Sequence, residues 1–231
     1  MQYIYFMRHG ETAYNLAGRV QGGTDIPLNE TGIREAYLAR DYFEKNHVYF
    51  DRVVSSPLRR ARRTAMIVSG RPQTEIAEDP RIVELNFGDA EGKFVRDLPE
   101  GVLNLFFHPE RYEVPANGES VPQLRQRCSA FLADMAQIFD REPETENILA
   151  VSHGAALRGM ISCIGNSAPE DFWVDNLENC CSVRTSYADG QFHIEEYLHP
   201  LSGTEFMVPP WRRIRGGGEP VLDAAGGIDG R

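Results

Sequence analysis

Two histidines, each followed by a glycine and preceded by a short apolar segment, are the residues of this chain best suited to chemistry. Arg8 and His9 follow the apolar run 3–7, and His153 comes shortly after the run 148–151. Apolar runs of this length, rich in aromatic and β-branched residues, are typical of buried strands. Because ligands of an open α/β sheet bind past the carboxyl ends of its strands, we expect both histidines at one ligand-binding edge.

The chemistry that these residue types favour is the transfer of a phosphoryl group. A neutral imidazole can act as a nucleophile, and a guanidinium beside it can hold the phosphoryl oxygens while they gain charge. A glycine after the histidine lets the backbone bend and approach a ligand closely. One such histidine would be a weak signal, because single motif matches are often structural. Two at one sheet edge are a stronger signal.

Further motifs, in the order in which they occur, resemble the histidine phosphatase superfamily, also called the phosphoglycerate mutase-like family. The resemblance extends from about residue 1 to about residue 200. The motifs are Arg8-His9-Gly10-Glu11-Thr12 with Asn15, the arginine-rich segment 55–65, Glu84 before Phe87-Gly88, and Ser152-His153-Gly154.

The resemblance implies both a fold and a mechanism. The fold is an α/β three-layer sandwich with a mostly parallel central sheet flanked by helices. His9 would attack the phosphoryl group and become a phosphohistidine, while Arg8, Arg60 and His153 surround the transferred oxygens. His153 would be protonated to act as a cation, and Glu84, at the position of the family's acid, would protonate the leaving group. No metal or other cofactor is needed if enough cationic donors converge.

Four further residues are candidates for substrate binding. Asn15 matches the family's phosphate-contacting asparagine, and Gln21 and Gly22 lie in a polar, glycine-containing loop after the first strand. Gly154 opens a predicted helix whose amino end favours an anion. Asp89 and Glu91, carboxylates near the expected acid, are weaker alternatives for the proton donor.

Three functions remain open on these residues. A phosphatase and a mutase share the phosphohistidine and differ in its acceptor, which is water or a second hydroxyl. The segment 84–92 resembles the phosphatase branch, and the longer substrate-binding insertion of the mutase branch is missing. We therefore expect a phosphatase acting on a small phosphomonoester. The third function, a non-catalytic protein that binds a phosphorylated ligand, does not explain why all residues needed for chemistry are present.

Composition restricts the partners. The 231 residues carry a formal net charge of -10, which argues against nucleic acid or an anionic membrane as a general partner. The four cysteines show neither metal-like spacing nor a secreted disulfide pattern, and no signal peptide or bilayer-spanning run is visible. We expect a cytoplasmic protein, and leave a homodimer as an open alternative.

The remaining elements follow from periodicity and capping residues. We expect one domain over residues 1–200 with an insertion at about 88–118 that holds at most short helices, followed by a C-terminal extension over 201–231 that is a tail or a docking segment. We expect helices over residues 30–45, 57–70 and 154–164, and another after residue 120. We expect strands over 51–55 and 148–152 and short extended segments over 74–78 and 81–85. Residues 182–187 and 191–197 are expected to form a hairpin.

Overall fold

Alternating apolar side chains on the central strands produce three layers. The computed structural model describes residues 1–173 and 177–202 and two short strands, β7 (Val221–Leu222) and β8 (Ile228–Asp229). On β1 (Gln2–Arg8), Ile4 and Phe6 join one buried cluster, whereas Tyr5 and Met7 join another. Successive side chains of a strand point to opposite faces, so each face of the sheet has its own core.

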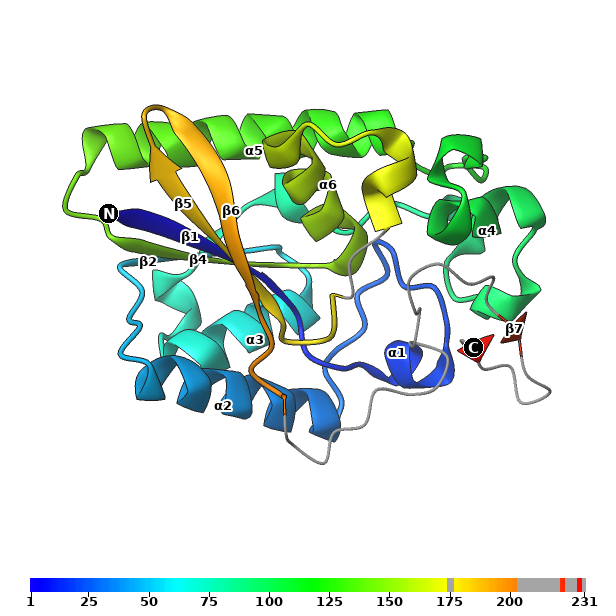
Figure 1. Ribbon diagram of the computed structural model, residues 1–231. Helices are drawn as coiled ribbons and strands as arrows, with labels where there is room; N and C mark the ends of the chain where they lie inside the picture. Colours follow the sequence, from blue (N-terminus) through cyan, green and yellow to red (C-terminus); the bar gives the residue numbers. More distant parts are fainter. Residues whose placement is uncertain (174–176, 203–220, 223–227, 230–231) are drawn as a thin grey trace.

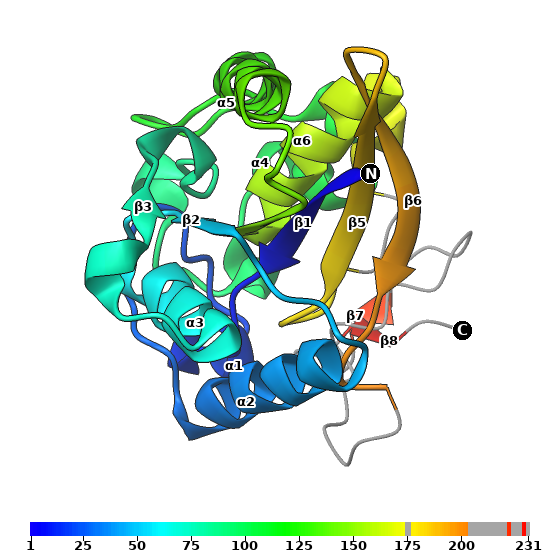
Figure 2. The same ribbon diagram turned by 90° about the vertical axis from the view of Figure 1, so that its left-hand side faces the viewer.

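Helices cover both faces of the sheet (Figures 1 and 2). One face packs against α5 (Val121–Arg141) and α6 (Gly154–Gly165), and the other against α2 (Glu30–Lys45) and α3 (Arg59–Ser69). The predicted three-layer α/β arrangement is confirmed.

Within the part of the chain that the structure describes, the sheet has six strands in the order β3-β2-β4-β1-β5-β6. The strands β3 (Ala77–Glu78), β2 (Arg52–Ser55), β4 (Asn147–Ser152) and β1 are parallel. The strands β5 (Ser182–Ala188) and β6 (Gln191–Leu198) add an antiparallel hairpin, as predicted. Its turn residues, Asp189 and Gly190, both have positive φ, as a tight two-residue hairpin turn requires.

Two extended segments predicted before the insertion are largely absent. Of residues 74–78, only the two residues of β3 form a strand, after the 3₁₀ turn Gln73–Glu75. The prediction of a strand over 81–85 is wrong, because Pro80–Ile82 forms a 3₁₀ turn and the chain then continues irregularly. The carbonyls of this segment accept hydrogen bonds from side chains instead of a neighbouring strand.

Two predictions of local structure near the strand ends also fail. The helix expected from Pro57, with Ser56 as its cap, begins at Arg59, and its N-cap position is Leu58. The loop expected after the first strand contains a short helix, α1 (Ala13–Ala17), closed by a capping box between Thr12 and Asn15. By contrast, α2 with its Asn29 cap, α5 with its Ser120 and Gln123 capping box, and α6 agree with the predicted helices.

The insertion contains one helix of two turns, α4 (Glu100–Phe107), with the 3₁₀ turns Val95–Asp97 and Pro109–Arg111 on either side. Figure 1 shows α4 beyond the carboxyl ends of the parallel strands. The proposed docking segment around 209–215 lies outside the described residues. Over the part of the chain that the structure describes, no helix is long and apolar enough to cross a membrane.

Close contact between two glycines brings α2 against the end of β1. A Cβ atom at Gly10 would lie 2.4 Å from the carbonyl oxygen of Gly32, and one at Gly32 would lie 2.1 Å from that of Glu11. Glycine after His9 therefore serves the approach of a helix. The same contact fixes the backbone next to His9.

Replacing Gly32 with alanine should destabilise the fold. The new methyl group would meet backbone atoms of Glu11, which cannot rotate away, so we expect the free energy of unfolding to fall by about 1–3 kcal/mol. Urea unfolding of Gly32→Ala beside Thr31→Ala, a change one residue earlier in the same helix, measures this. Equal stability of the two variants would contradict the close-packing argument.

Candidate active site

Parallel pairing of β1 with β4 brings the two predicted histidines together. Arg8 is aligned with Ser152, so that His9 and His153 both follow immediately after paired positions. The backbone N–H of His9 donates to the carbonyl of Ser152 at 3.0 Å. The centroids of the two imidazole rings are 5.1 Å apart, and both side chains are buried.

Hydrogen bonding fixes the tautomer of His9. Its Nδ1 lies 2.7 Å from the carbonyl oxygen of Gly10. A carbonyl only accepts, so Nδ1 carries the proton and Nε2 carries the lone pair in the neutral ring. The amide of Asn179 donates to the His9 carbonyl at 2.8 Å and holds the main chain. The imidazole is thus oriented for attack through Nε2.

Arg60 is fully buried and is held by three acceptors. Its Nη1 and Nη2 atoms donate to the carbonyls of Thr24 at 2.7 Å and Gly22 at 2.8 Å, and Nε donates to His153 Nδ1 at 3.1 Å. Burial lowers the pKa of Arg60 to about 10, which nearby carboxylates including Glu84 partly oppose. The side chain therefore stays charged at neutral pH.

The structure contradicts the expectation that His153 is protonated. Its Nδ1 accepts from Arg60, and its Nε2 lies 2.8 Å from the hydroxyl of Ser56, so the ring is neutral with its proton on Nε2. Complete burial, followed by the charge of Arg60, lowers the pKa of His153 well below its ordinary value. His153 does not line the substrate cavity described below, and its contacts orient Arg60.

Glu91 holds the loop that supports Arg60. One carboxylate oxygen accepts from the N–H groups of Gly23 at 2.8 Å and Phe87 at 3.2 Å, and the other accepts from the N–H of Thr24 at 2.9 Å. Gly22, with φ of 52°, packs against this carboxylate, and a Cβ there would lie 2.0 Å from Glu91 Oε1. Gly22 therefore supports Arg60 through its carbonyl and does not line the cavity. Glu91 holds this loop in place through hydrogen bonds to its backbone.

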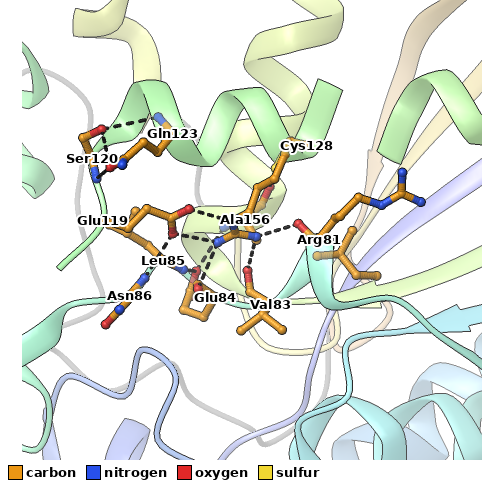
Figure 3. A network of polar contacts seen from close by, with 12 residues as sticks. Arg81, Val83, Glu84, Leu85, Asn86, Glu119, Ser120, Gln123, Cys128 and Ala156 are labelled. Carbon is orange, nitrogen blue, oxygen red and sulfur yellow. Dashed lines mark hydrogen bonds and ion pairs between the residues drawn. The ribbon is translucent and has the colours of Figure 1, made fainter. Parts of the chain in front are cut away.

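Glu84 binds the amino end of α6. Its Oε1 accepts from the N–H groups of Leu85 at 2.9 Å, Ala155 at 3.0 Å and Ala156 at 3.0 Å. Among the described residues, Oε2 accepts only from Ala155, at 3.2 Å. Figure 3 shows Glu84 within this network beside Ala156 and Glu119. A carboxylate at a helix N-terminus is favoured by the exposed amides and the helix dipole.

Arg8 supplies a further donor directed at the site. Its Nη1 donates to the carbonyl of Leu177 at 2.6 Å, whereas its Nε is buried and has no partner among the described residues. A Cβ at Gly154 would lie 3.7 Å both from Arg8 Nε and from Glu84 Oε2. The absence of a side chain at Gly154 keeps the space between cation and carboxylate open. A buried donor without a partner marks a place for an anionic ligand.

Most of the predicted site residues line one cavity of about 180 Å³ at the carboxyl end of the parallel strands. Another part of the cavity lining is apolar and aromatic, and sequence reasoning did not identify it. Among the described residues, no cluster of His, Cys, Asp and Glu has the arrangement of a metal site. The predicted residues lining the cavity are Arg8, His9, Asn15, Gln21, Arg60, Glu84 and Gly154, and the apolar wall comprises Phe87, Val95, Phe106, Phe107 and Trp173.

Asn15 and Gln21 line the cavity and present donors to it. Thr12 donates to the side-chain oxygen of Asn15 through its N–H at 3.2 Å and to that of Gln21 through its hydroxyl at 2.8 Å. Both carbonyl oxygens are thereby occupied, which leaves the amide N–H groups for a ligand. Phosphoryl oxygens are acceptors and fit such donors.

Arg158 is a cavity residue that sequence reasoning missed. It lies one helical turn after Gly154, and its Nη1 donates to the carbonyl of Gly154 at 3.0 Å. Its guanidinium lies 4.1 Å from the ring centroid of Trp173. The i, i+4 spacing from a residue at the amino end of α6 was the available signal.

Comparison with known proteins agrees with this geometry. Residues 4–199 match the family model described as the histidine phosphatase superfamily (branch 1). An uncharacterized phosphatase, PhoE, of Bacillus subtilis is 33% identical over 199 residues, which cover 85% of this chain and 94% of PhoE. A probable phosphoglycerate mutase, GpmB, of Yersinia pestis is 32% identical over 82% of this chain and 86% of its own.

A solved structure extends the comparison. The phosphoserine phosphatase of Entamoeba histolytica, in a histidine-to-alanine mutant bound to phosphoserine, superposes with a TM-score of 0.74. It is 27% identical, and the match covers 87% of this chain and 98% of the other. This chain belongs to the histidine phosphatase superfamily, branch 1. It is an enzyme that hydrolyses phosphate esters.

Acid should weaken the fold through His153. Because its pKa is lowered in the folded state, the unfolded chain binds the proton more readily below pH 6.5, and stability falls as pH falls. Between pH 7.5 and 5.5 this residue should lower the free energy of unfolding by about 1.4 kcal/mol. Urea unfolding across this range measures the decline.

The decline should be smaller in His153→Gln, which cannot titrate. His47→Asn is the matched control, since His47 is an exposed histidine with φ of 56° that asparagine also adopts. It should retain the slope of the wild type. Identical slopes in all three proteins would contradict a neutral, buried His153.

Proposed function

We propose that the enzyme hydrolyses small phosphomonoesters through a phosphohistidine on His9 and needs no metal ion. The observation that carries this proposal is the orientation of His9. Its Nδ1–H donates a hydrogen bond to the Gly10 carbonyl, so Nε2 is the nucleophilic atom. His9 lines the same cavity as Arg8 and Arg60. Two guanidinium groups supply the positive charge that a transferred phosphoryl group requires.

The reaction proceeds in two steps. His9 Nε2 attacks phosphorus, the bond from phosphorus to the ester oxygen breaks, and Glu84 gives its proton to that oxygen as the alcohol leaves. Glu84, now a carboxylate, then takes a proton from water, whose oxygen attacks phosphorus. The phosphorus–nitrogen bond breaks, and inorganic phosphate and the starting form of the enzyme result.

Substrate binding brings the negative phosphoryl group beside Glu84, and two like charges at one site favour the protonated carboxyl group. We place its proton on Oε2. Oε1 accepts three backbone hydrogen bonds and is therefore committed to the amino end of α6, whereas Oε2 accepts one. Oε2 also lies closest to the open space at Gly154, opposite Arg8. In this assignment one oxygen anchors the side chain and the other transfers the proton.

Loss of His9 should remove the reaction and the intermediate together. In His9→Ala, kcat/KM for p-nitrophenyl phosphate should fall by roughly 10³-fold or more, because the nucleophile is absent. Wild type, quenched during turnover, should carry one additional phosphoryl group by mass spectrometry, and the variant none. Activity should survive a chelator.

His193→Ala, which changes an exposed histidine on β6, is the control and should behave as wild type. Chelator-sensitive turnover would refute metal independence, and a fully active His9→Ala would refute the nucleophile. Interconversion of 2- and 3-phosphoglycerate without net hydrolysis would favour the mutase alternative, which the relative GpmB represents.

The apolar wall of the cavity favours a substrate whose alcohol portion is apolar or aromatic. Phe106 contacts Trp173 edge-on at 4.8 Å between centroids and stacks on Phe87 at 6.4 Å. Phe107 and Val95 extend this surface. The cationic side binds the phosphoryl group, which leaves the alcohol portion to pack against the rings.

Wild type should therefore prefer benzyl phosphate to phosphoserine, the ligand bound to the Entamoeba enzyme. In Trp173→Ala, kcat/KM for benzyl phosphate should fall roughly tenfold with phosphoserine little changed, because an aromatic contact is lost. Trp173→Phe should retain most of the preference. If wild type preferred phosphoserine and Trp173→Ala left that preference unchanged, the proposed role of the apolar wall would be contradicted.

A further inference from the structure

We infer that Arg127 and Glu119, two residues outside the substrate cavity, position Glu84 for proton transfer. This inference rests on the proposed role of Glu84 as the acid. Arg127 lies on α5, in the helical layer behind the segment that carries Glu84. Neither Arg127 nor Glu119 is among the residues that line the cavity, so both are positioning residues.

Among the described residues, the segment 81–84 has no neighbouring strand, and Arg127 supplies the hydrogen-bond donors that such a strand would give. Its Nη1 donates to the carbonyls of Arg81 and Val83, each at 2.6 Å, and its Nη2 donates to the carbonyl of Glu84 at 3.0 Å. Backbone carbonyls in a partly buried segment need such donors. One guanidinium thus fixes the main chain over four consecutive residues, up to and including the acid.

Glu119 forms hydrogen bonds with both Arg127 and Asn86. Its Oε1 accepts from Arg127 Nε at 2.7 Å and its Oε2 from Nη2 at 2.9 Å, in a two-pronged ion pair. The same Oε2 accepts from the N–H of Asn86 at 3.2 Å, and the N–H of Glu119 donates to the Asn86 carbonyl at 2.7 Å. Figure 3 shows Glu119 and Asn86 beside Glu84.

The environment of Arg127 favours its charged form. Burial disfavours the charged guanidinium, but the hydrogen bonds and the negative charge of Glu119 outweigh it, and the pKa of Arg127 is raised. The side chains of Arg127 and Glu119 are 20% and 16% exposed, so solvent screens them little. Removing either charge would leave the other largely buried without its partner.

Glu84 is therefore held from two directions. Backbone amides of α6 donate to its carboxylate, and Arg127 of α5 donates to its main-chain carbonyl. Glu84, Arg127 and Glu119 together line a surface groove. Because α5 and α6 pack against each other, these contacts set the place of the carboxylate relative to the cavity. A shift of about 1 Å in such a group can cost roughly 10²-fold in rate.

The dependence of the rate on the leaving group tests this role. Benzyl phosphate releases a poor leaving group that needs a proton, whereas p-nitrophenolate leaves as a stable anion. In Arg127→Met we expect kcat/KM for benzyl phosphate to fall about tenfold or more, and that for p-nitrophenyl phosphate to stay within about threefold of wild type. Because kcat/KM covers the steps up to phosphoryl transfer, breakdown of the phosphohistidine does not mask the effect.

Two milder variants extend the test in case Arg127→Met folds poorly. Arg127→Lys keeps a charge but loses the forked donor, and Glu119→Gln keeps the side-chain shape but loses the ion pair, so both should show the same selective loss to a smaller degree. Arg81→Met is the matched control. Its side chain makes ion pairs with Asp79 and Asp134 in the same region, and its removal should leave the ratio of the two substrates unchanged.

Glu84→Gln separates this inference from the proposed function. If Glu84→Gln shows the selective loss and the variants at Arg127 and Glu119 reduce both substrates equally or neither, the positioning role is overturned and the proposed function stands. If Glu84→Gln shows no selective loss, the acid assignment fails and the inference fails with it.

Discussion

The arrangement of this active site depends on keeping a fully buried guanidinium charged. Arg60 is surrounded by protein, and moving a cation out of water is costly unless hydrogen-bond acceptors compensate for the lost water. Two loop carbonyls and a neutral imidazole supply acceptors, and none of them cancels its charge. The positive charge therefore remains available to an anion that enters the cavity, which is what a phosphoryl-transfer site needs.

Other features of the site follow from this requirement. Glu91 holds the loop whose carbonyls bind Arg60, and Gly22 lets the backbone pass close to that carboxylate. Ser56 accepts the Nε2 proton of His153, which leaves Nδ1 to accept from Arg60. The Ser56 hydroxyl also accepts from the N–H of Leu58 at 3.4 Å, and α3 begins at Arg59, two residues later than the capping signal at Ser56 predicts.

The sequence predicts those parts of the site that local patterns determine. His9 and His153 could be placed together because each follows an apolar strand, and parallel strands end at one edge. Arg60 could be separated from its neighbouring arginines because it lies in the first turn of the predicted helix, near the carboxyl edge of the preceding strand, and matches the family motif. The protonation of His153 could not be predicted, because it depends on burial and on contact with a residue 93 positions away. Arg127 resembles an exposed arginine on an amphipathic helix, and its role arises only from the irregular segment that packs beside it.

The amino end of α6 shows how the same physical rule can serve a different purpose from the expected one. A helix N-terminus attracts an anion, and α6 points at the active site, so the rule alone assigns its amides to the substrate phosphate. The amides of Ala155 and Ala156 instead bind the carboxylate of Glu84. Positive charge for the substrate must then come from Arg8 and Arg60, while the helix holds the acid beside them. This division of roles lets a carboxylate and two guanidinium groups lie around one cavity without the acid simply pairing with the arginines.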